Sequence, residues 1–253
     1  MNSLANALVQ FWKSSIGKKL IVAITGAMLV LFLIGHMAGN LLIFQGREDM
    51  NGYAEFLHHM LHGWGVWFAR IGLLAAFLIH IVATISLTRQ NREARQSRYE
   101  FQKTNVASRS SQIMIWSGLT VLAFVVFHIF HFTVRVDSDL AGMKESVDGA
   151  ERHDVYGMVV RGFQNLFVVL FYIVGITLLC SHLSHGIASV FQTLGLRSDE
   201  TRDAEKKLGL AIAVILWLGF LSIPVSIGLG IKKDHGITDS SREAPAQVLV
   251  SED

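Results

Sequence analysis

The sequence predicts an all-α, polytopic membrane protein whose helices cross the bilayer five times. Hydrophobic residues make up 51% of the 253 residues, and the mean hydropathy is +0.43. These residues are concentrated in continuous blocks between charged segments, and each block reaches the about 20 residues that a helix needs to cross a hydrocarbon core of about 30 Å. The continuity of the blocks argues against a strand barrel, in which apolar and polar residues would alternate.

The blocks place the five expected spans at residues 17–44, 65–87, 113–136, 162–191 and 208–231. Together they predict one transmembrane domain over residues 1–233, followed by a polar tail over residues 234–253. No run of small residues suited to cleavage precedes the first block, so we expect the first span to remain in the mature protein. Cys180 is the only cysteine, so this chain by itself provides neither a disulfide nor a cysteine-ligated metal site.

Lysine and arginine are distributed unequally between the two sides that five crossings define. Segments 1–19, 88–112 and 192–207 contain 3, 6 and 4 of them, against 1, 2 and 3 in segments 45–64, 137–160 and 232–253. Positive charge collects on the cytoplasmic side, so we expect a cytoplasmic N-terminus and an external C-terminus. Segment 88–112 is typical of a topological anchor near anionic lipid, and docking of an acidic cytoplasmic partner is the alternative. The net charge of +2 gives no sign of nucleic-acid binding.

Four histidines each lie within a different expected span, where an ionisable side chain is costly. In this topology His36 and His128 each lie eight residues before the outer end of their spans, about 12 Å deep at 1.5 Å per residue. His80 and His182 lie seven and nine residues before the inner ends of theirs, about 10–14 Å deep. The four histidines therefore form two pairs, one near each face of the membrane.

Two pairs of imidazoles at two depths have the geometry to ligate two flat macrocycles stacked across a bilayer, and imidazole is a common axial ligand of haem iron. Gly26 and Gly118 each precede an outer-level histidine by ten residues. Because glycine has no side chain, these two positions would leave room for the edge of the inner macrocycle. The alternative is that the glycines only allow neighbouring helices to pack closely. For the histidines themselves, the alternatives are hydrogen bonds between helices and a proton relay, as in transporters.

Three stretches of the chain carry a resemblance to a known family. They are GAMLVLFLIGHMAGNLLIFQG in the first span, SGLTVLAFVVFH in the third and SHLSHGIASVFQTLGL in the fourth. In order and spacing they resemble the single-chain, five-helix, dihaem cytochrome b subunit of succinate dehydrogenases and fumarate reductases, over nearly the whole chain up to about Lys233. The resemblance implies that His36 and His128 bind the outer of two haems b and that His80 and His182 bind the inner one.

The resemblance also implies a place in electron transport, in the respiratory chain and the tricarboxylic acid cycle. A flavoprotein subunit with FAD would oxidise succinate or reduce fumarate, and an iron–sulfur subunit would connect it to the inner haem, while the outer haem exchanges electrons with menaquinone. We therefore expect this chain to be the quinone-reactive membrane subunit of a succinate:quinone oxidoreductase in the bacterial cytoplasmic (inner) membrane. The dicarboxylate chemistry belongs to the partner subunits, and a higher oligomer of the complex is compatible with this expectation.

Two further histidines compete for the ligand roles. His131 and His185 follow His128 and His182 by three residues and lie on nearly the same helical faces. In the third span, the ten-residue spacing from Gly118 favours His128 as the ligand. In the fourth span, the family's pattern of a ligand histidine followed by glycines fits His182 with Gly186 and Gly195. We therefore expect His131 and His185 to bond haem propionates, lipid headgroups or backbone, and they remain secondary candidates as ligands.

Charged residues at the membrane faces are candidates for supporting roles. Arg70 and Arg161 at the outer ends of their spans, and Arg89 at an inner end, are suited to neutralise haem propionates, with snorkelling to the interface as the alternative. Oxidation of a quinol near the outer face needs a base. Glu55 resembles in position the acidic residue that serves this purpose in related enzymes, and a solvated loop charge is the alternative.

The outer segment between the first two spans contains His58, His59 and His62. Two imidazoles four residues apart can share zinc, but the segment offers no third ligand of suitable spacing. An amphipathic helix at the membrane interface explains the segment better, with four side chains facing lipid: Tyr53, Phe56, Leu57 and Trp64.

The chain departs from the family pattern at Cys180. Fumarate reductases of the family carry a glutamate there, two residues before the fourth-span ligand, for transmembrane proton movement, and its absence favours a succinate-oxidising role. Two other hypotheses remain open. One is a dihaem cytochrome b subunit of another quinone-linked dehydrogenase, such as a hydrogenase or a formate dehydrogenase. The other is a haem-free, proton-coupled transporter.

Overall fold

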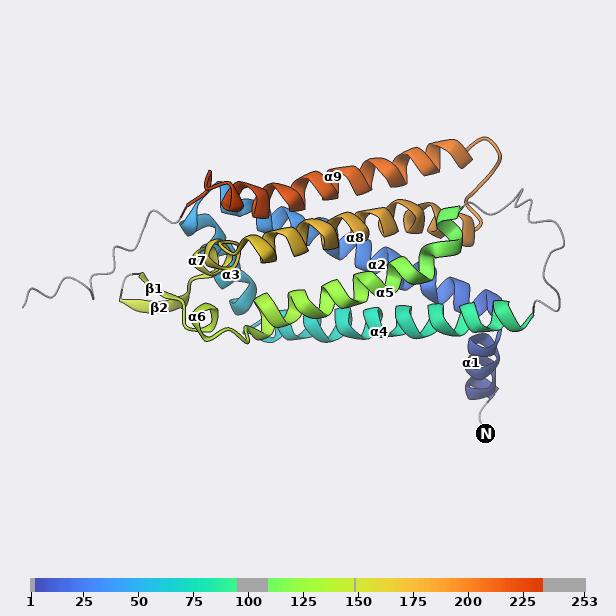
Figure 1. The fold of residues 1–253 in the computed structure, drawn as a ribbon. Helices are drawn as coiled ribbons and strands as arrows, with labels where there is room; N and C mark the ends of the chain where they lie inside the picture. The colour runs from blue at the N-terminus through green and yellow to red at the C-terminus, as the bar shows by residue number, and fades with distance from the viewer. Residues whose placement is uncertain (1–2, 95–108, 148, 234–253) are drawn as a thin grey trace, which may run out of the picture.

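The computed structural model describes residues 3–94, 109–147 and 149–233, and within them five long helices run side by side (Figure 1). They are α2 (Ser15–Leu41), α4 (Trp64–Glu93), α5 (Arg109–His128), α8 (Leu166–Thr193) and α9 (Arg202–Gly228). Each belongs to a stretch long and apolar enough to cross a membrane. The expected all-α, polytopic fold with five candidate spans is therefore confirmed.

The helix bounds differ from the expected spans at several ends, and α9, for example, begins six residues earlier than expected. α8 begins four residues later than expected, because a separate helix, α7 (Val155–Gly162), ends first. The side chain of Asn165 then caps α8 by accepting a hydrogen bond of 2.9 Å from the Phe167 N–H. α4 continues six residues further than expected, and α5 is extended by a π-helical segment, η2 (Ile129–Val134).

Short elements gather at one end of the bundle, which we call the hairpin end (Figure 1). They are η1 (Leu42–Phe44), α3 (Arg47–His59), α6 (Ser138–Ala141), β1 (Lys144–Val147), β2 (Ala150–His153) and α7. The two strands pair antiparallel, with Lys144 opposite His153 and Val147 opposite Ala150. The sequence analysis expected only a connection here, so the hairpin is an addition to the all-α prediction.

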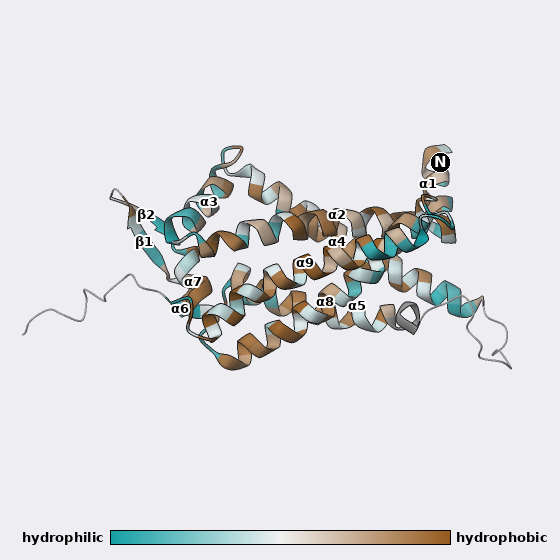
Figure 2. Cartoon of the chain, turned by 90° about the horizontal axis from the view of Figure 1, so that it is seen from above, coloured by the Kyte–Doolittle hydropathy of each residue, from teal (hydrophilic) through white to brown (hydrophobic). Residues whose placement is uncertain are grey.

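The opposite end, which we call the α1 end, carries the helix α1 (Ser3–Lys13). Both views show α1 projecting from the bundle across the direction of the long helices (Figures 1 and 2). Every residue of α1 is exposed, and its apolar side chains, Leu4 and Leu8 among them, lie on the face opposite Asn6 and Gln10. This amphipathic pattern is typical of a helix that lies in the plane of a membrane interface.

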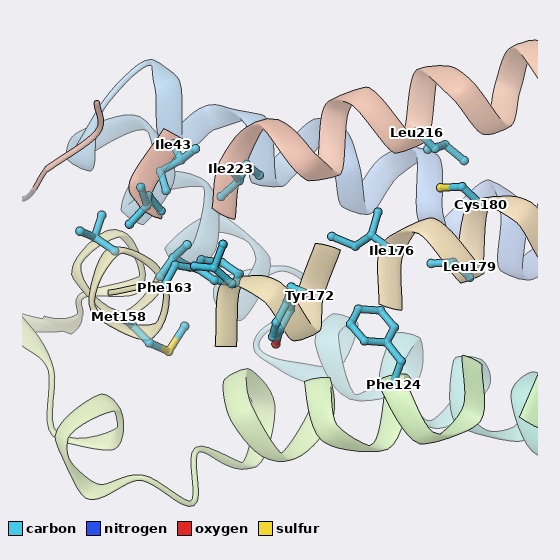
Figure 3. Close-up of a cluster of buried hydrophobic side chains, with 14 of the residues drawn as sticks. Ile43, Phe124, Met158, Phe163, Tyr172, Ile176, Leu179, Cys180, Leu216 and Ile223 are labelled. Carbon is cyan, nitrogen blue, oxygen red and sulfur yellow. The ribbon is translucent and has the colours of Figure 1, made fainter. Parts of the chain in front are cut away.

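α8 is central to the packing and contacts α9, α5 and α2. Glycines allow close approach at two of these contacts: the Phe124 ring of α5 lies against Gly175 of α8, and Gly209 of α9 lies against the α8 backbone at Ser184. Buried apolar side chains of α5, α7, α8 and α9 form the core between these helices (Figure 3). Cys180 of α8 is part of this core.

The outward faces of the long helices carry many large exposed apolar side chains. Leu31, Trp116 and Phe167 are 69%, 63% and 82% exposed, and hydrophobic residues run along the bundle between hydrophilic ends (Figure 2). Water would not support so large an apolar surface, whereas a bilayer would. The exposure therefore agrees with a multi-pass membrane protein.

Candidate cofactor-binding site

The structure brings the imidazole rings of His36 of α2 and His128 of α5 side by side, one roughly perpendicular to the other. Their ring centroids are 5.9 Å apart, with an angle of 80° between the ring planes. Two metal–nitrogen bonds of about 2 Å plus the radii of two imidazole rings would separate the centroids by about 6 Å. The pair therefore has the spacing of two axial ligands on one metal. The Phe32 ring stacks on His36, with 5.2 Å between the ring centroids.

Tyr172 of α8 connects His128 to its competitor His131. The Tyr172 hydroxyl lies 3.2 Å from Nδ1 of His128 and 3.0 Å from Nδ1 of His131. One phenol has a single proton to donate, so it donates to one imidazole and accepts from the other. Tyr172 is itself buried, and its hydroxyl points toward α5 (Figure 3). The sequence analysis did not single out this residue.

At the inner level, His80 of α4 lies against the neighbouring helix α2. Its Nδ1 is 3.0 Å from Oγ1 of Thr25. A Cβ atom placed on Gly26 would lie 3.3 Å from Cε1 of His80. The His80 imidazole thus packs against the α2 backbone at Gly26, and the Thr25 hydroxyl on the same turn contacts its Nδ1.

His182 of α8 lies against α5 in the same manner. Its Nδ1 is 3.0 Å from Oγ of Ser117, and a Cβ atom on Gly118 would lie 3.6 Å from its Cε1. At both glycines the neighbour in contact is the imidazole of an inner-level histidine.

The two competing histidines have different surroundings. The side chain of His185 is exposed on α8, whereas that of His182 is half-buried. His131 is half-buried as well and lines a cavity of about 380 Å³ at the hairpin end, together with Arg161, Asp137 and Asp139. Exposure therefore separates His182 from His185 but does not separate His128 from His131.

The donor set fits a haem better than a bare metal ion. Among the described residues, no group of three or more His, Cys, Asp or Glu side chains could hold a metal ion. A haem brings four ligands in its plane and requires only two from the protein, which is what the facing histidines at one level offer. His80 and His182 each have Nδ1 beside a hydroxyl oxygen, so that Nε2 is the nitrogen left for a metal.

The candidate arginines occupy both ends of the bundle. Arg161 donates a hydrogen bond of 2.9 Å to Gln164 at the hairpin end, and Arg70 lies 5.3 Å from the centroid of the Trp67 ring. At the α1 end, Arg89 and the buried Lys18 line a cavity of about 500 Å³ between α2 and α4. These positions agree with arginines at the membrane faces.

Glu55 lies in an ionic cluster at the hairpin end. Arg152 of β2 bonds Glu145 at 2.6 Å, Glu48 at 2.8 Å and Glu55 at 3.0 Å. Burial opposes the charge on Arg152, but hydrogen bonds to the three carboxylates outweigh it and raise the pKa of the guanidinium. Glu55 is 46% exposed and also lies 3.9 Å from His59. A carboxylate at this place is held in position by Arg152 and remains open to solvent.

The three histidines of the outer segment belong to α3 and the turn after it. The side chains of His58, His59 and His62 are exposed, as are Phe56 and Trp64, which are 61% and 64% exposed. On the opposite face of α3, Met50 and Asn51 are buried, and the helix packs against α4 and α7.

Asp154 and Asn51 hold α3, the hairpin and α7 together. Both side chains are 1% exposed. Asn51 donates a hydrogen bond of 2.9 Å to Asp154, which also pairs with Arg47 and accepts from the Gly157 N–H at the start of α7. This cluster could not be predicted from the sequence, because nothing in the spacing of residues about a hundred positions apart indicates that they meet.

Comparisons of the chain with protein-family models, with curated proteins and with solved structures found no match. The assignment of a function therefore depends on the geometry of the site and on the resemblance of the spans.

Proposed function

We propose that this chain is the membrane-anchor cytochrome b subunit of a succinate:menaquinone oxidoreductase. The observation that carries the proposal is the arrangement of four histidines from four helices as two pairs at two levels of one apolar bundle. The resemblance of the first, third and fourth spans to the dihaem family supports it.

In this proposal His36 and His128 are the axial ligands near the hairpin end, and His80 and His182 are those near the α1 end. Two haems b supply one-electron redox chemistry when bound. Thr25, beside His80, and His36 are eleven residues apart on α2, about 16 Å at 1.5 Å per residue. The protein thus holds two redox positions across much of the hydrocarbon core and keeps water from them with apolar side chains.

The positive-inside distribution supports a cytoplasmic α1 end and an external hairpin end, in the cytoplasmic (inner) membrane of a bacterium. An iron–sulfur subunit with its flavoprotein would then dock at the α1 end. Menaquinone would react near the hairpin end, where Glu55 is suited to exchange a proton with the quinol. Cys180, buried in the core, offers no carboxylate for proton movement, which favours succinate oxidation as the direction.

A pyridine haemochrome assay on the purified full-length protein tests the proposal most directly. We expect two haems b per chain. A protein without haem would overturn the proposal and favour a proton-coupled transporter instead. If two haems are present, co-purification with a flavoprotein and an iron–sulfur protein distinguishes a succinate dehydrogenase from another quinone-linked dehydrogenase. Succinate-dependent reduction of menaquinone in membranes then tests the reaction itself.

A further inference from the structure

The Thr25 hydroxyl donates its proton to a backbone carbonyl of its own helix. Oγ1 of Thr25 donates to the carbonyl oxygen of Ile21 at 2.7 Å. A hydroxyl has one proton, so the same oxygen accepts at its contact of 3.0 Å with Nδ1 of His80. The carbonyl oxygen of Val22, 3.3 Å from the same hydroxyl, is a second acceptor for the Thr25 proton. Nδ1 of His80 therefore carries the proton.

Ser117 on α5 makes the same two contacts, one with a carbonyl of its own helix and one with a histidine. Oγ of Ser117 donates to the carbonyl oxygen of Met114 at 2.9 Å, and it lies 3.0 Å from Nδ1 of His182. With its proton on Met114, the hydroxyl oxygen accepts from the imidazole. Nδ1 of His182 also carries the proton.

A neutral imidazole with its proton on Nδ1 has its lone pair on Nε2, and this is the form that binds a metal through Nε2. Both inner-level histidines are thus fixed in the same tautomer by the same device. Tyr172 does not act in this way at the outer level, because its single hydroxyl is shared between His128 and His131.

The pairing of a hydroxyl and a glycine with a histidine of a neighbouring helix occurs at matching positions of α2 and α5. On α2 and on α5 a hydroxyl residue is followed by glycine at the next position, by phenylalanine after seven and by histidine after eleven. The residues are Thr25, Gly26, Phe32 and His36 on α2, and Ser117, Gly118, Phe124 and His128 on α5. In each case the hydroxyl and the glycine receive a histidine from a neighbouring helix, while the histidine of the repeat belongs to the other level.

The geometry points to Thr25 and Ser117 as positioning residues that set the tautomer and orientation of His80 and His182 for ligation of one inner haem. This inference rests on the proposed function, because it concerns ligands of that cofactor. An acceptor on Nδ1–H makes an imidazole a more basic ligand, which stabilises oxidised iron. Removal of the acceptor therefore raises the midpoint potential of the inner haem and weakens its retention.

The test is redox potentiometry of full-length protein in membranes, with optical spectra for haem content. Thr25→Val and Ser117→Ala each remove one hydroxyl, while Thr25→Ser and Ser117→Thr retain it. Thr120→Val is the matched control, since the Thr120 hydroxyl is exposed on α5 and bonds only helix carbonyls, at 2.8 Å and 3.4 Å. We expect Thr25→Val and Ser117→Ala to raise the midpoint potential of the same haem and to speed its loss on the order of 10- to 100-fold.

The hydroxyl-retaining variants and the control should keep wild-type potentials. Unchanged potentials in both Thr25→Val and Ser117→Ala, with two haems present, would overturn this inference and leave the proposed function standing. Shifts of two different haems would overturn the assignment of both residues to one site. A wild-type protein without haem would instead overturn the proposed function. If Thr25→Val does not accumulate in membranes, Ser117→Ala tests the same arrangement on the other helix.

Discussion

The imidazoles of His36 and His128 lie 5.9 Å apart between ring centroids, although the two residues are separated by ninety-two positions in the chain. They come from α2 and α5, and the ring planes stand at 80° to one another. Two such rings on one metal would approach it from opposite sides through their Nε2 atoms. The first prediction therefore concerns the pair formed by His36 and His128.

His128→Ala should remove the outer haem and leave the inner one, so that the haem content falls from two per chain to one. His131→Ala should retain both, because its imidazole bonds Tyr172 and lines the cavity at the hairpin end. Pyridine haemochrome spectra of the two variants provide the measurement. Loss of haem from His131→Ala with retention in His128→Ala would exchange the two roles.

His182→Ala should likewise reduce the content to one haem, with the inner one missing. His185→Ala is the matched control, because its side chain is exposed on the same helix one turn further on. We expect the spectrum of His185→Ala to match that of the wild type. Two intact haems in His182→Ala would show that the inner ligand is a different residue.

Substitution of the two inner-level glycines should have unequal effects. A Cβ atom at Gly26 would lie 3.3 Å from Cε1 of His80, which is tighter than ordinary contact, whereas at Gly118 the distance to His182 is an ordinary 3.6 Å. Gly26→Ala should therefore displace the His80 ring and lower haem content, while Gly118→Ala keeps both haems. Equal haem retention in the two variants, measured optically, would contradict this contact as a determinant of the site.

Glu55→Gln should slow quinone-linked turnover by about 100-fold or more, the usual effect of losing a general base, with both haems retained. Glu48→Gln is the control, because Glu48 also bonds Arg152 and is 77% exposed. It removes a carboxylate from the same arginine without removing the proposed base. Comparable turnover in the two variants would mean that Glu55 serves only the ionic cluster.

Asp154→Ala should destabilise the hairpin end. The substitution removes one of the two acceptors of the Asn51 amide, leaves the Gly157 N–H without its side-chain acceptor and breaks the pair with Arg47, so we expect the free energy of unfolding to fall by about 2 kcal/mol or more. Unfolding in detergent measures the loss. Glu151→Gln, which removes the exposed pair with Lys144, should change stability little. Similar stability of the two variants would show that the buried cluster does not hold this end together.

Much of the fold follows from local sequence. Long apolar blocks predict spanning helices wherever they occur, because a backbone in lipid must satisfy its hydrogen bonds within the helix. The depth of each histidine then follows from the rise per residue, which is why His36 and His128 were expected at one level before any contact was known. The hairpin was not expected, because strands of four residues in a polar connection leave almost no pattern.

What the sequence by itself determined is the all-α architecture with five candidate spans and the position of each histidine along its span, since these depend on hydropathy and helical rise along a single segment. Only the tertiary structure decided which side chains meet across helices. It placed His80 on Thr25 and Gly26, His182 on Ser117 and Gly118, and Tyr172 between His128 and His131. Those contacts depend on the rotation and packing of helices about one another, and hydropathy does not encode either.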